Sequence, residues 1–216
     1  MINYDFIIVG SGAGGLSAAL HASLHGRVAV ITKRGALDSN SNWAQGGIAC
    51  VTSELDSIEQ HVSDTLIAGA GLCNEEAVRI IVTEGPERIA ELVKWGVDFD
   101  QRPASDGHLE FDLTKEGGHS QRRVLHAADA TGREITEKLL AEVRTRPNIT
   151  LYENHFAVDI ITTTKLGFVS EDRVLGLYVL NEETREVLTF RSDRVVLATG
   201  GCGRVYLYTT NPRVAT

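Results

Sequence analysis

The feature that most constrains the fold is GSGAGG at residues 10–15, which has the spacing G-x-G-x-x-G. It follows the β-branched and aromatic segment YDFIIV (residues 4–9), and a helical pattern of apolar residues runs over residues 13–25. A second apolar segment, RVAVIT, occupies residues 27–32. Strand, glycine turn, helix and strand within about 30 residues form a βαβ unit, so the two strands are expected to be parallel.

The glycine loop has the form of a site for a dinucleotide pyrophosphate. Gly10 permits the tight turn, Gly12 lets backbone N–H groups approach a phosphate, and Gly15 allows the helix to pack close to the strand. The helix N-terminus adds partial positive charge and free N–H groups. Because the loop lies between a strand and a helix, we favour a nucleotide site over a bare strand–helix turn.

The end of the second strand departs from the usual dinucleotide fingerprint. An Asp or Glu that holds a ribose hydroxyl is common there, whereas this chain has Thr32, Lys33 and Arg34. Thr32 can bond a ribose, and Lys33 can either lie near phosphate or adenosine or be a solvated strand end. The motif alone leaves the two alternatives for Lys33 open. The absence of this acidic residue argues more strongly against NAD as the ligand than against FAD.

The remaining patterns predict further helices and strands. Helices are expected at residues 57–68, 74–82, 87–95 and 131–146, with the second and third separated near Gly85-Pro86. Residues 98–123 are expected to be irregular. Strands, partly antiparallel, are expected at residues 149–153, 156–165, 173–180, 187–191 and 194–197. The sequence therefore predicts an α/β fold with a parallel sheet and a smaller antiparallel β-meander, in one domain.

Composition excludes several classes of protein. The net charge of −8 argues against a nucleic-acid partner, which would favour a basic surface. No apolar run reaches the roughly 18 residues of a membrane span. The three cysteines, Cys50, Cys73 and Cys202, lack metal-ligand spacing, which favours reduced thiols in a cytoplasmic protein without a metal site.

Several longer motifs carry a family resemblance: SNWAQGGIA (residues 41–49), TLIAGAGLC (65–73), EGGHSQRRVLHAADATGREI (116–135), VVLATGG (195–201) and YTTNP (208–212). With them the chain resembles the flavoprotein family of succinate dehydrogenase, fumarate reductase and L-aspartate oxidase, and the L-aspartate oxidase branch in particular. The resemblance implies a Rossmann-like FAD-binding domain interrupted by a mobile capping domain. Residues 1–216 are then expected to be its N-terminal part, with the capping domain and the C-terminal helical domain absent.

The resemblance also implies which residues bind FAD. The glycine loop would hold the pyrophosphate, Lys33 matches an FAD contact of the L-aspartate oxidases, and residues 40–47 would wrap the flavin. From its Gly and Asn content alone, that last segment would be a mobile surface loop. The expected cofactor-binding residues are Gly10, Ser11, Gly12, Ala13, Gly14, Gly15, Lys33, Asn40, Ser41, Asn42, Trp43, Ala44, Gln45, Gly46 and Gly47.

Asn40 bears on how the flavin is held. In succinate dehydrogenases the matching residue is a His that carries covalently attached flavin. Asn has no nucleophilic ring nitrogen for such a bond, so the resemblance implies non-covalent FAD.

Glu116 is the expected substrate-orienting residue. It precedes Gly117-Gly118, at a place where the succinate and fumarate enzymes have an aromatic residue. A carboxylate there would form a charge-assisted hydrogen bond with the ammonium of aspartate, worth roughly 1.5–3 kcal/mol, or about ten- to a hundredfold in discrimination. A solvated loop acid is the alternative for an isolated Glu.

The same stretch is locally positive, which suits a dicarboxylate substrate. Its cations are Lys115, Arg122, Arg123 and Arg133. Most of these are expected to be surface or structural residues, Arg133 in particular. Structural packing is favoured for His126, and the role of His119 stays open. Asp129 and Thr131 are expected in a turn and a helix cap.

The resemblance implies FAD-dependent oxidation of L-aspartate to iminoaspartate, with oxygen or fumarate as electron acceptor, the first step of de novo NAD biosynthesis. By pathway, quinolinate synthase is a candidate partner. The alternatives are a soluble fumarate reductase or succinate dehydrogenase flavoprotein, and a truncated FAD-binding module without turnover.

Overall fold

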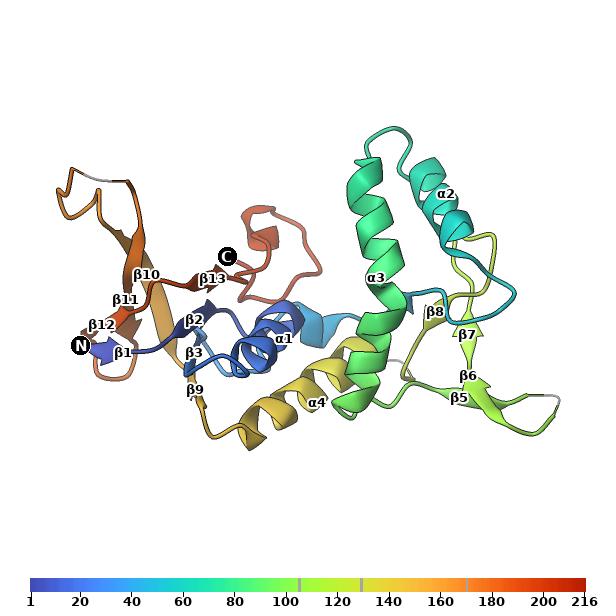
Figure 1. The fold of residues 1–216 in the computed structure, drawn as a ribbon, viewed down its shortest axis with the longest axis horizontal. Coiled ribbons are helices and arrows are strands. Elements are labelled where there is room, and N and C mark those ends of the chain that lie inside the picture. Colours follow the sequence, from blue (N-terminus) through green and yellow to red (C-terminus); the bar gives the residue numbers. More distant parts are fainter. Residues whose placement is uncertain (105, 129, 170) are drawn as a thin grey trace. The chain divides into compact units, whose positions relative to one another are not determined.

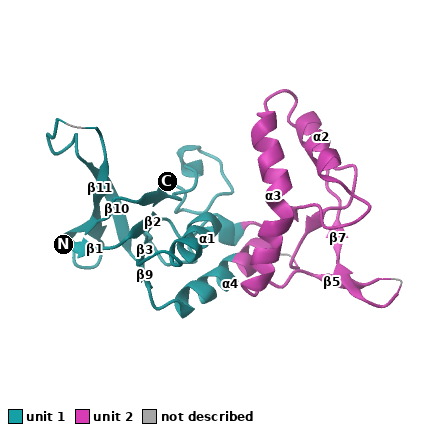
Figure 2. Cartoon of the chain, viewed as in Figure 1, with its two compact units in different colours: residues 1–43, 136–216 teal, residues 44–135 magenta. Residues whose placement is uncertain are grey.

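The computed structural model describes residues 1–104, 106–128, 130–169 and 171–216. The chain divides into two compact units, which Figure 2 shows in different colours. Unit 1 comprises residues 1–43 and 136–216, and unit 2 comprises residues 44–135. Asp129, for which a turn is expected, lies outside the described residues.

Unit 1 is centred on a four-stranded parallel sheet in the order β13-β2-β3-β9 (Figure 1). Its strands are β2 (Phe6–Val9), β3 (Val28–Ile31), β9 (Ile149–Tyr152) and β13 (Val195–Leu197). Helix α1 (Ala13–Ala22) joins β2 to β3, which confirms the βαβ unit. It ends three residues before the predicted end. The Ser23 hydroxyl there donates to the carbonyl of Leu20, which offers the backbone an alternative to further helix.

The predicted antiparallel meander is also confirmed. Strands β10, β11 and β12 pair antiparallel in sequence order, and β1 joins the edge parallel to β12. The bounds are β1 (Ile2–Asn3), β10 (His155–Thr162), β11 (Val174–Asn181) and β12 (Val187–Arg191).

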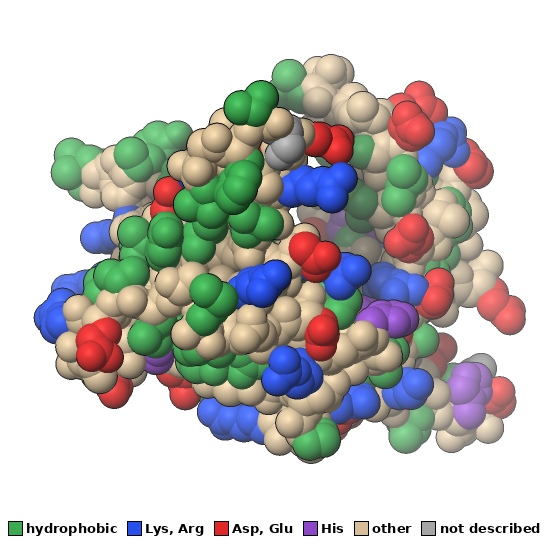
Figure 3. Space-filling model, turned by 60° about the vertical axis from the view of Figure 1, so that its left-hand side comes forward, with side chains coloured by type: hydrophobic (Ala, Val, Ile, Leu, Met, Phe, Trp, Pro, Cys, Tyr) green, Lys and Arg blue, Asp and Glu red, His purple; other side chains and the backbone are tan. Residues whose placement is uncertain are grey.

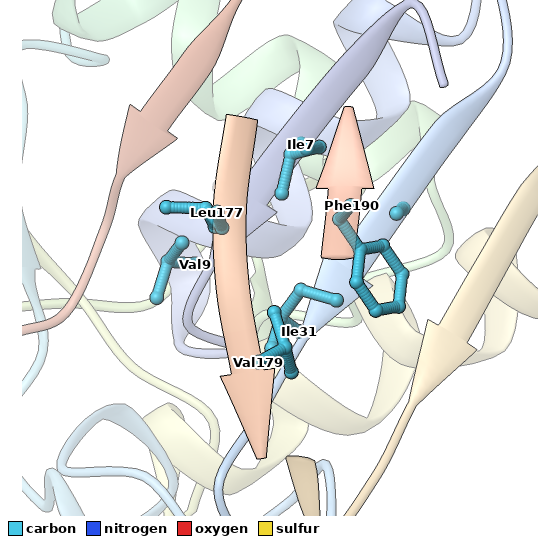
Figure 4. Packing of buried hydrophobic residues seen from close by; sticks show 7 residues of the cluster. Ile7, Val9, Ile31, Leu177, Val179 and Phe190 are labelled. Carbon is cyan, nitrogen blue, oxygen red and sulfur yellow. The ribbon is translucent and has the colours of Figure 1, made fainter. Parts of the chain in front are cut away.

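The core of unit 1 explains why its parallel strands are continuously apolar. Alternate side chains of a strand point to opposite faces of the sheet, and here both faces are covered. One face packs on the meander, as Figure 4 shows, through Ile7, Val9, Ala29, Ile31, Leu177, Val179 and Phe190. The other face packs on α1, through Ile8, Val28, Val30 and Ala19.

The described part of unit 2 contains two complete helices, the start of α4 (Thr131–Thr145) and two small antiparallel sheets. The helices are α2 (Ile58–Ala68) and α3 (Glu75–Lys94). The strands are β4 (Ile48–Ala49), β5 (Gln101–Pro103), β6 (Leu109–Phe111), β7 (Leu113–Thr114) and β8 (Val124–Leu125). The prediction of an irregular segment at residues 98–123 is therefore wrong over β5, β6 and β7. These strands are two or three residues long, too short for alternation of polar and apolar residues to reveal them.

Helix α3 runs through Pro86 without a break, so the predicted separation into two helices is wrong. The proline nitrogen cannot donate to the carbonyl of Val82, and a proline ring normally crowds the Cβ of the residue before it. Gly85 has no Cβ, so the second of these penalties is absent. The helix therefore continues, although it loses one backbone hydrogen bond and the proline ring crowds the carbonyl of Val82.

Helix α4 (Thr131–Thr145) confirms the last predicted helix, but Thr131 is not its cap. The Thr131 hydroxyl donates to the carbonyl of Gly46 at 2.9 Å and accepts from the backbone N–H of Ala127 at 3.1 Å. Its side chain is thus bonded to residues that precede the helix.

The surface carries charges of both signs. On the face shown in Figure 3, acidic and basic side chains are interspersed, and hydrophobic side chains gather over part of the surface. In unit 1 the exposed hydrophobic side chains include Val205, Tyr206, Leu207 and Tyr208. Among the described helices, none has the length and apolar character needed to cross a membrane.

Candidate functional site

A cavity of about 640 Å³ opens in unit 1 at the carboxyl ends of the parallel strands. Val9, Ile31 and Leu197, the last residues of β2, β3 and β13, line it. The chain proceeds from β2 to β3 and β9 on one side and returns with β13 on the other side of β2. Ligands of open α/β sheets bind at such a switch point in strand order. The topology therefore makes this cavity the candidate nucleotide site.

The glycine loop forms one wall of the cavity and requires glycine at two positions. Gly10 has φ of +114°, and a Cβ there would lie 2.2 Å from the carbonyl oxygen of Ala198. A Cβ at Gly15 would lie 2.0 Å from the carbonyl oxygen of Gly10. Both distances are far inside van der Waals contact, so the loop, the end of β13 and α1 approach one another only because these side chains are missing.

The rest of the loop presents backbone to the cavity. Gly10, Ser11, Gly12 and Gly14 line it, whereas Ala13 and Gly15 do not. Gly12 is the N-cap of α1 and has no side chain to accept from the first-turn N–H groups. The N–H of Ala13 is bonded to Ser41 Oγ at 3.1 Å. The N-terminus of α1 thus lies at the cavity wall, which favours an anionic group there.

The end of β3 supplies Thr32 and Lys33 to the cavity. Thr32 is buried, and its Oγ1 accepts a hydrogen bond from Ser11 Oγ at 3.0 Å. Lys33 Nζ donates to the backbone oxygen and to Oγ1 of Thr216, at 3.1 and 2.8 Å. Burial, and then the charge of Arg34, lower the pKa of Lys33. Lys33 is therefore one of the residues that line the candidate nucleotide site.

Asn40 and Ser41 are the two residues of the expected flavin loop that line the cavity. Asn40 Oδ1 is buried, and no donor in the described part of the chain reaches it. A buried acceptor without a partner costs about 1–3 kcal/mol, so this atom indicates a donor that a ligand would supply.

The residues that follow Ser41 make other contacts in this structure. Ser41–Trp43 forms a 3₁₀ turn in which Trp43 is exposed and Asn42 Oδ1 accepts from Thr136 Oγ1 at 3.0 Å. Ala44, Gln45, Gly46 and Gly47 are exposed residues of unit 2. Gly47 lies against β8, since a Cβ there would be 2.3 Å from the carbonyl oxygen of Leu125. Of the eight residues 40–47, the structure places only Asn40 and Ser41 at the cavity.

Sequence reasoning missed part of the cavity wall. Residues 155–160 of β10 and residues 214–216 line it without being expected to do so. The pattern of β10 indicates a strand but not which loop it faces. Residues 198–201, at the glycine-rich end of the VVLATGG motif, also line the cavity.

The loop around Glu116 lies in unit 2. The N–H of His119 donates to the carbonyl of Glu116 at 3.2 Å, which closes a four-residue turn. Gly118, its third residue, has φ of +86°, a value that favours glycine. Glu116 is exposed, and among the described residues no ion pair neutralises its carboxylate.

Arg123 is not available to a substrate. Its side chain is fully buried and forms ion pairs with Asp56 at 2.8 Å and with Asp64 at 2.6 Å. Burial opposes the charge on Arg123, but its bonds to the two carboxylates outweigh this and raise its pKa. For Asp64, burial is likewise outweighed by hydrogen bonds from Ser120 and Arg123, which lower the pKa to about 2.

Other bases of this stretch also have structural contacts. Lys115 Nζ donates to the backbone oxygen of Ser120 at 2.9 Å, and Arg122 donates to that of Leu113 at 3.1 Å. His126 Nδ1 lies 2.8 Å from Asp100 Oδ2, in keeping with the packing role favoured for it. The locally positive sequence thus overstates the charge that is free for a dicarboxylate.

The parallel sheet, the glycine loop at its switch point and the unsatisfied acceptor of Asn40 define a dinucleotide-binding domain of the flavoprotein type. Residues 5–216 match the protein family described as an FAD binding domain, and the chain belongs to this family. FAD is accordingly its cofactor. The cavity fits this group, because the glycines leave room for a pyrophosphate at the start of α1 and Asn40 Oδ1 lacks a donor.

Two curated proteins are similar to nearly the whole chain. The chain is 52% identical over 215 residues to L-aspartate oxidase 1 of Ralstonia nicotianae and 51% identical over 212 residues to L-aspartate oxidase of Pseudomonas aeruginosa. These alignments cover 100% and 97% of this chain but only 40% and 39% of those proteins. The chain therefore spans about two-fifths of the length of these two proteins.

Solved structures show the same fold. A mutant of the E. coli quinol fumarate reductase FrdA is similar with a TM-score of 0.89 and 33% identity, over 99% of this chain and 35% of that chain. The Mycobacterium smegmatis Sdh1 complex in the apo form gives a TM-score of 0.88 and 27% identity, over 99% and 37%.

Proposed function

We propose that this chain is the FAD-binding part of an L-aspartate oxidase, which oxidises L-aspartate to iminoaspartate with oxygen or fumarate as acceptor, the first step of de novo NAD biosynthesis. The observation that carries the proposal is the exposed Glu116 carboxylate on a glycine turn, without an ion-pair partner among the described residues. The names and identities of the relatives support it.

Each group of residues has a role in this reaction. The backbone of Gly10–Gly15 would hold the pyrophosphate, Lys33 would add positive charge to the same site, and Asn40 and Ser41 would bond the cofactor. When bound, FAD supplies a two-electron acceptor for the hydride that leaves Cα of aspartate. Glu116 would accept a hydrogen bond from the substrate ammonium and so fix the orientation of Cα. Asn42, Trp43, Ala44, Gln45, Gly46 and Gly47 stay in the proposed flavin loop.

The activity should be measured in the full-length protein of which this chain is proposed to be the FAD-binding part. Added L-aspartate should give hydrogen peroxide in air and iminoaspartate, detected through the oxaloacetate that forms on its hydrolysis. Succinate should give neither product at the same concentration. Oxidation of succinate without oxidation of aspartate would contradict the proposal.

Replacing Glu116 by Phe should raise the KM for aspartate about ten- to a hundredfold, because the ammonium loses its charged partner. The KM for fumarate, which has no amine, should change by less than about threefold. Steady-state kinetics with each substrate measure both. Glu76→Phe, at an exposed position of α3, is the control and should change neither. Equal effects of Glu116→Phe on both substrates would refute its role.

A fumarate reductase or succinate dehydrogenase flavoprotein is the second candidate, favoured by the similarity to the E. coli quinol fumarate reductase. Glu116 argues against it, since an aromatic residue is expected at that place in those enzymes. The third candidate is a truncated FAD-binding module without turnover. Robust aspartate oxidation by residues 1–216 alone would exclude this third candidate.

The flavin is expected to be non-covalent, because the Asn40 side chain has no nucleophilic nitrogen for a flavin bond. Acid precipitation of the holoprotein should leave the flavin absorbance in the supernatant. The Asn40→Ala variant should release its flavin in the same way and bind it more weakly. Flavin that stays with the wild-type pellet would show a covalent bond and contradict this expectation.

We also propose a cytoplasmic location and a pathway relation to quinolinate synthase. All three cysteines are free thiols in the structure, as expected for a reducing compartment. Fractionation of the source cells tests the location, and co-purification with quinolinate synthase tests the partner.

A further inference from the structure

We propose that Asp64 on α2 is a positioning residue for Glu116, acting through the loop of residues 116–120. This inference rests on the proposed function, because it concerns how the chain holds the residue that selects an amine. It is carried by contacts within unit 2 alone.

One face of α2 holds the loop. His61, Asp64 and Ala68 are spaced i, i+3 and i+7, so they lie on the same side of the helix. The His61 ring meets the His119 ring edge to face, with centroids 6.2 Å apart. Ala68 lies against Gly118, where an added Cβ would be 3.4 Å from the Ala68 Cβ. Each turn of this face thus contacts one part of the loop.

Asp64 supplies the polar anchor between these two contacts. Its Oδ2 accepts from the N–H of Ser120 at 2.8 Å and from Ser120 Oγ at 2.7 Å. The same oxygen accepts from Arg123 Nη1 at 2.6 Å. The Asp64 side chain is largely buried, with 12% exposed. One carboxylate oxygen therefore fixes both the residue that follows the turn and a buried arginine three residues later.

Glu116 itself has no such anchor. Its side chain is exposed and, within the described chain, lacks an ion pair, so its place depends on the turn that carries it. The turn is closed by the His119 N–H, and the next residue, Ser120, is held by Asp64. A small displacement of a substrate-orienting group is sufficient to lose much of its contribution. Loss of the Asp64 anchor should therefore affect the same interaction as loss of the Glu116 carboxylate.

The test uses Asp64→Ala in the full-length protein, with L-aspartate and fumarate as separate substrates. We expect the KM for aspartate to rise about tenfold and the KM for fumarate to change less than about twofold. The fold should survive, because Arg123 keeps its two bonds to Asp56 at 2.8 and 2.9 Å. If Asp64→Ala does not fold, Ser120→Ala takes its place, because it removes only a hydroxyl. Ser120→Ala should raise the KM for aspartate about threefold.

A double-mutant cycle separates positioning from general destabilisation. In a Glu116→Gln background, Asp64→Ala should change the KM for aspartate by less than about twofold, since the interaction it supports is already lost. Glu59→Ala, which removes an exposed carboxylate of the same helix that pairs with Arg79, should leave both KM values unchanged.

Two outcomes would overturn the inference. One is that Asp64→Ala raises the KM for aspartate by the same factor in the Glu116→Gln background as in the wild type. The other is that Asp64→Ala raises the KM for aspartate and the KM for fumarate equally. Failure of the proposed function looks different, because the wild-type protein would then not oxidise aspartate.

Discussion

Replacing Arg123 by Leu is expected to lower the free energy of unfolding by about 3–5 kcal/mol. The change leaves two carboxylates without their buried cation, and their side chains, at Asp56 and Asp64, are only 1% and 12% exposed. A carboxylate that is removed from water and left unpaired loses solvation that no new contact replaces. Urea unfolding followed by circular dichroism measures the difference.

Arg79 is the matched control for Arg123. It also pairs with two carboxylates, Glu59 and Glu75, but these side chains are 73% and 60% exposed. Solvent screens such pairs, so Arg79→Leu should cost less than about 1 kcal/mol. A similar loss for both variants would show that burial does not decide the strength of the Arg123 cluster.

The difference between wild type and Arg123→Leu should also depend on pH. The folded pKa of Asp64, about 2, lies below its ordinary value of 3.8. A depressed pKa contributes stability that is present above about pH 4 and is lost as the pH falls towards 2. The two proteins should therefore converge in stability in acid, and a difference that stays constant down to pH 3 would contradict the assignment.

The second large effect is expected at Gly10. Gly10→Ala should weaken FAD binding by more than about a hundredfold, which corresponds to about 2.7 kcal/mol of strain and displacement. The added methyl group would lie 2.2 Å from the carbonyl oxygen of Ala198. Gly10 also has a φ of +114°, which residues with a side chain rarely adopt. Because backbone meets backbone there, the loop or the end of β13 has to shift. Titration of the apoprotein with FAD, followed by flavin fluorescence, gives the affinity.

Gly35→Ala provides the comparison. Gly35 also lies in unit 1, but an added Cβ would meet its nearest atom, Asp38 Oδ2, at an ordinary 3.4 Å. FAD affinity should then change by less than about threefold. Thermal melting of both apoproteins shows whether Gly10→Ala acts on the site or on the whole unit. Normal FAD affinity in Gly10→Ala would contradict the glycine requirement.

Local chemistry explains what could be predicted for the site. The sequence GSGAGG after an apolar strand indicates a site because Gly10 and Gly15 meet local requirements of the turn and of helix packing. The cavity wall at β10 has no comparable signal, since a strand pattern does not specify which loop it faces. The side-chain oxygen of Asn42, a residue of the proposed flavin loop, accepts a hydrogen bond from Thr136 on α4, and no local pattern predicts this contact.

The sequence by itself determined the βαβ unit, the meander and most helices of this chain. Periodic apolar residues, glycines and caps act over a few positions, and those interactions are written in adjacent residues. Only the tertiary structure decided that Arg123 is a buried anchor instead of a substrate base, because its partners Asp56 and Asp64 are 67 and 59 positions away in the chain. It likewise decided that α3 continues through Pro86 and that β10 lines the cavity. Burial and charge pairing depend on which distant residues meet, and this is fixed only when the chain packs.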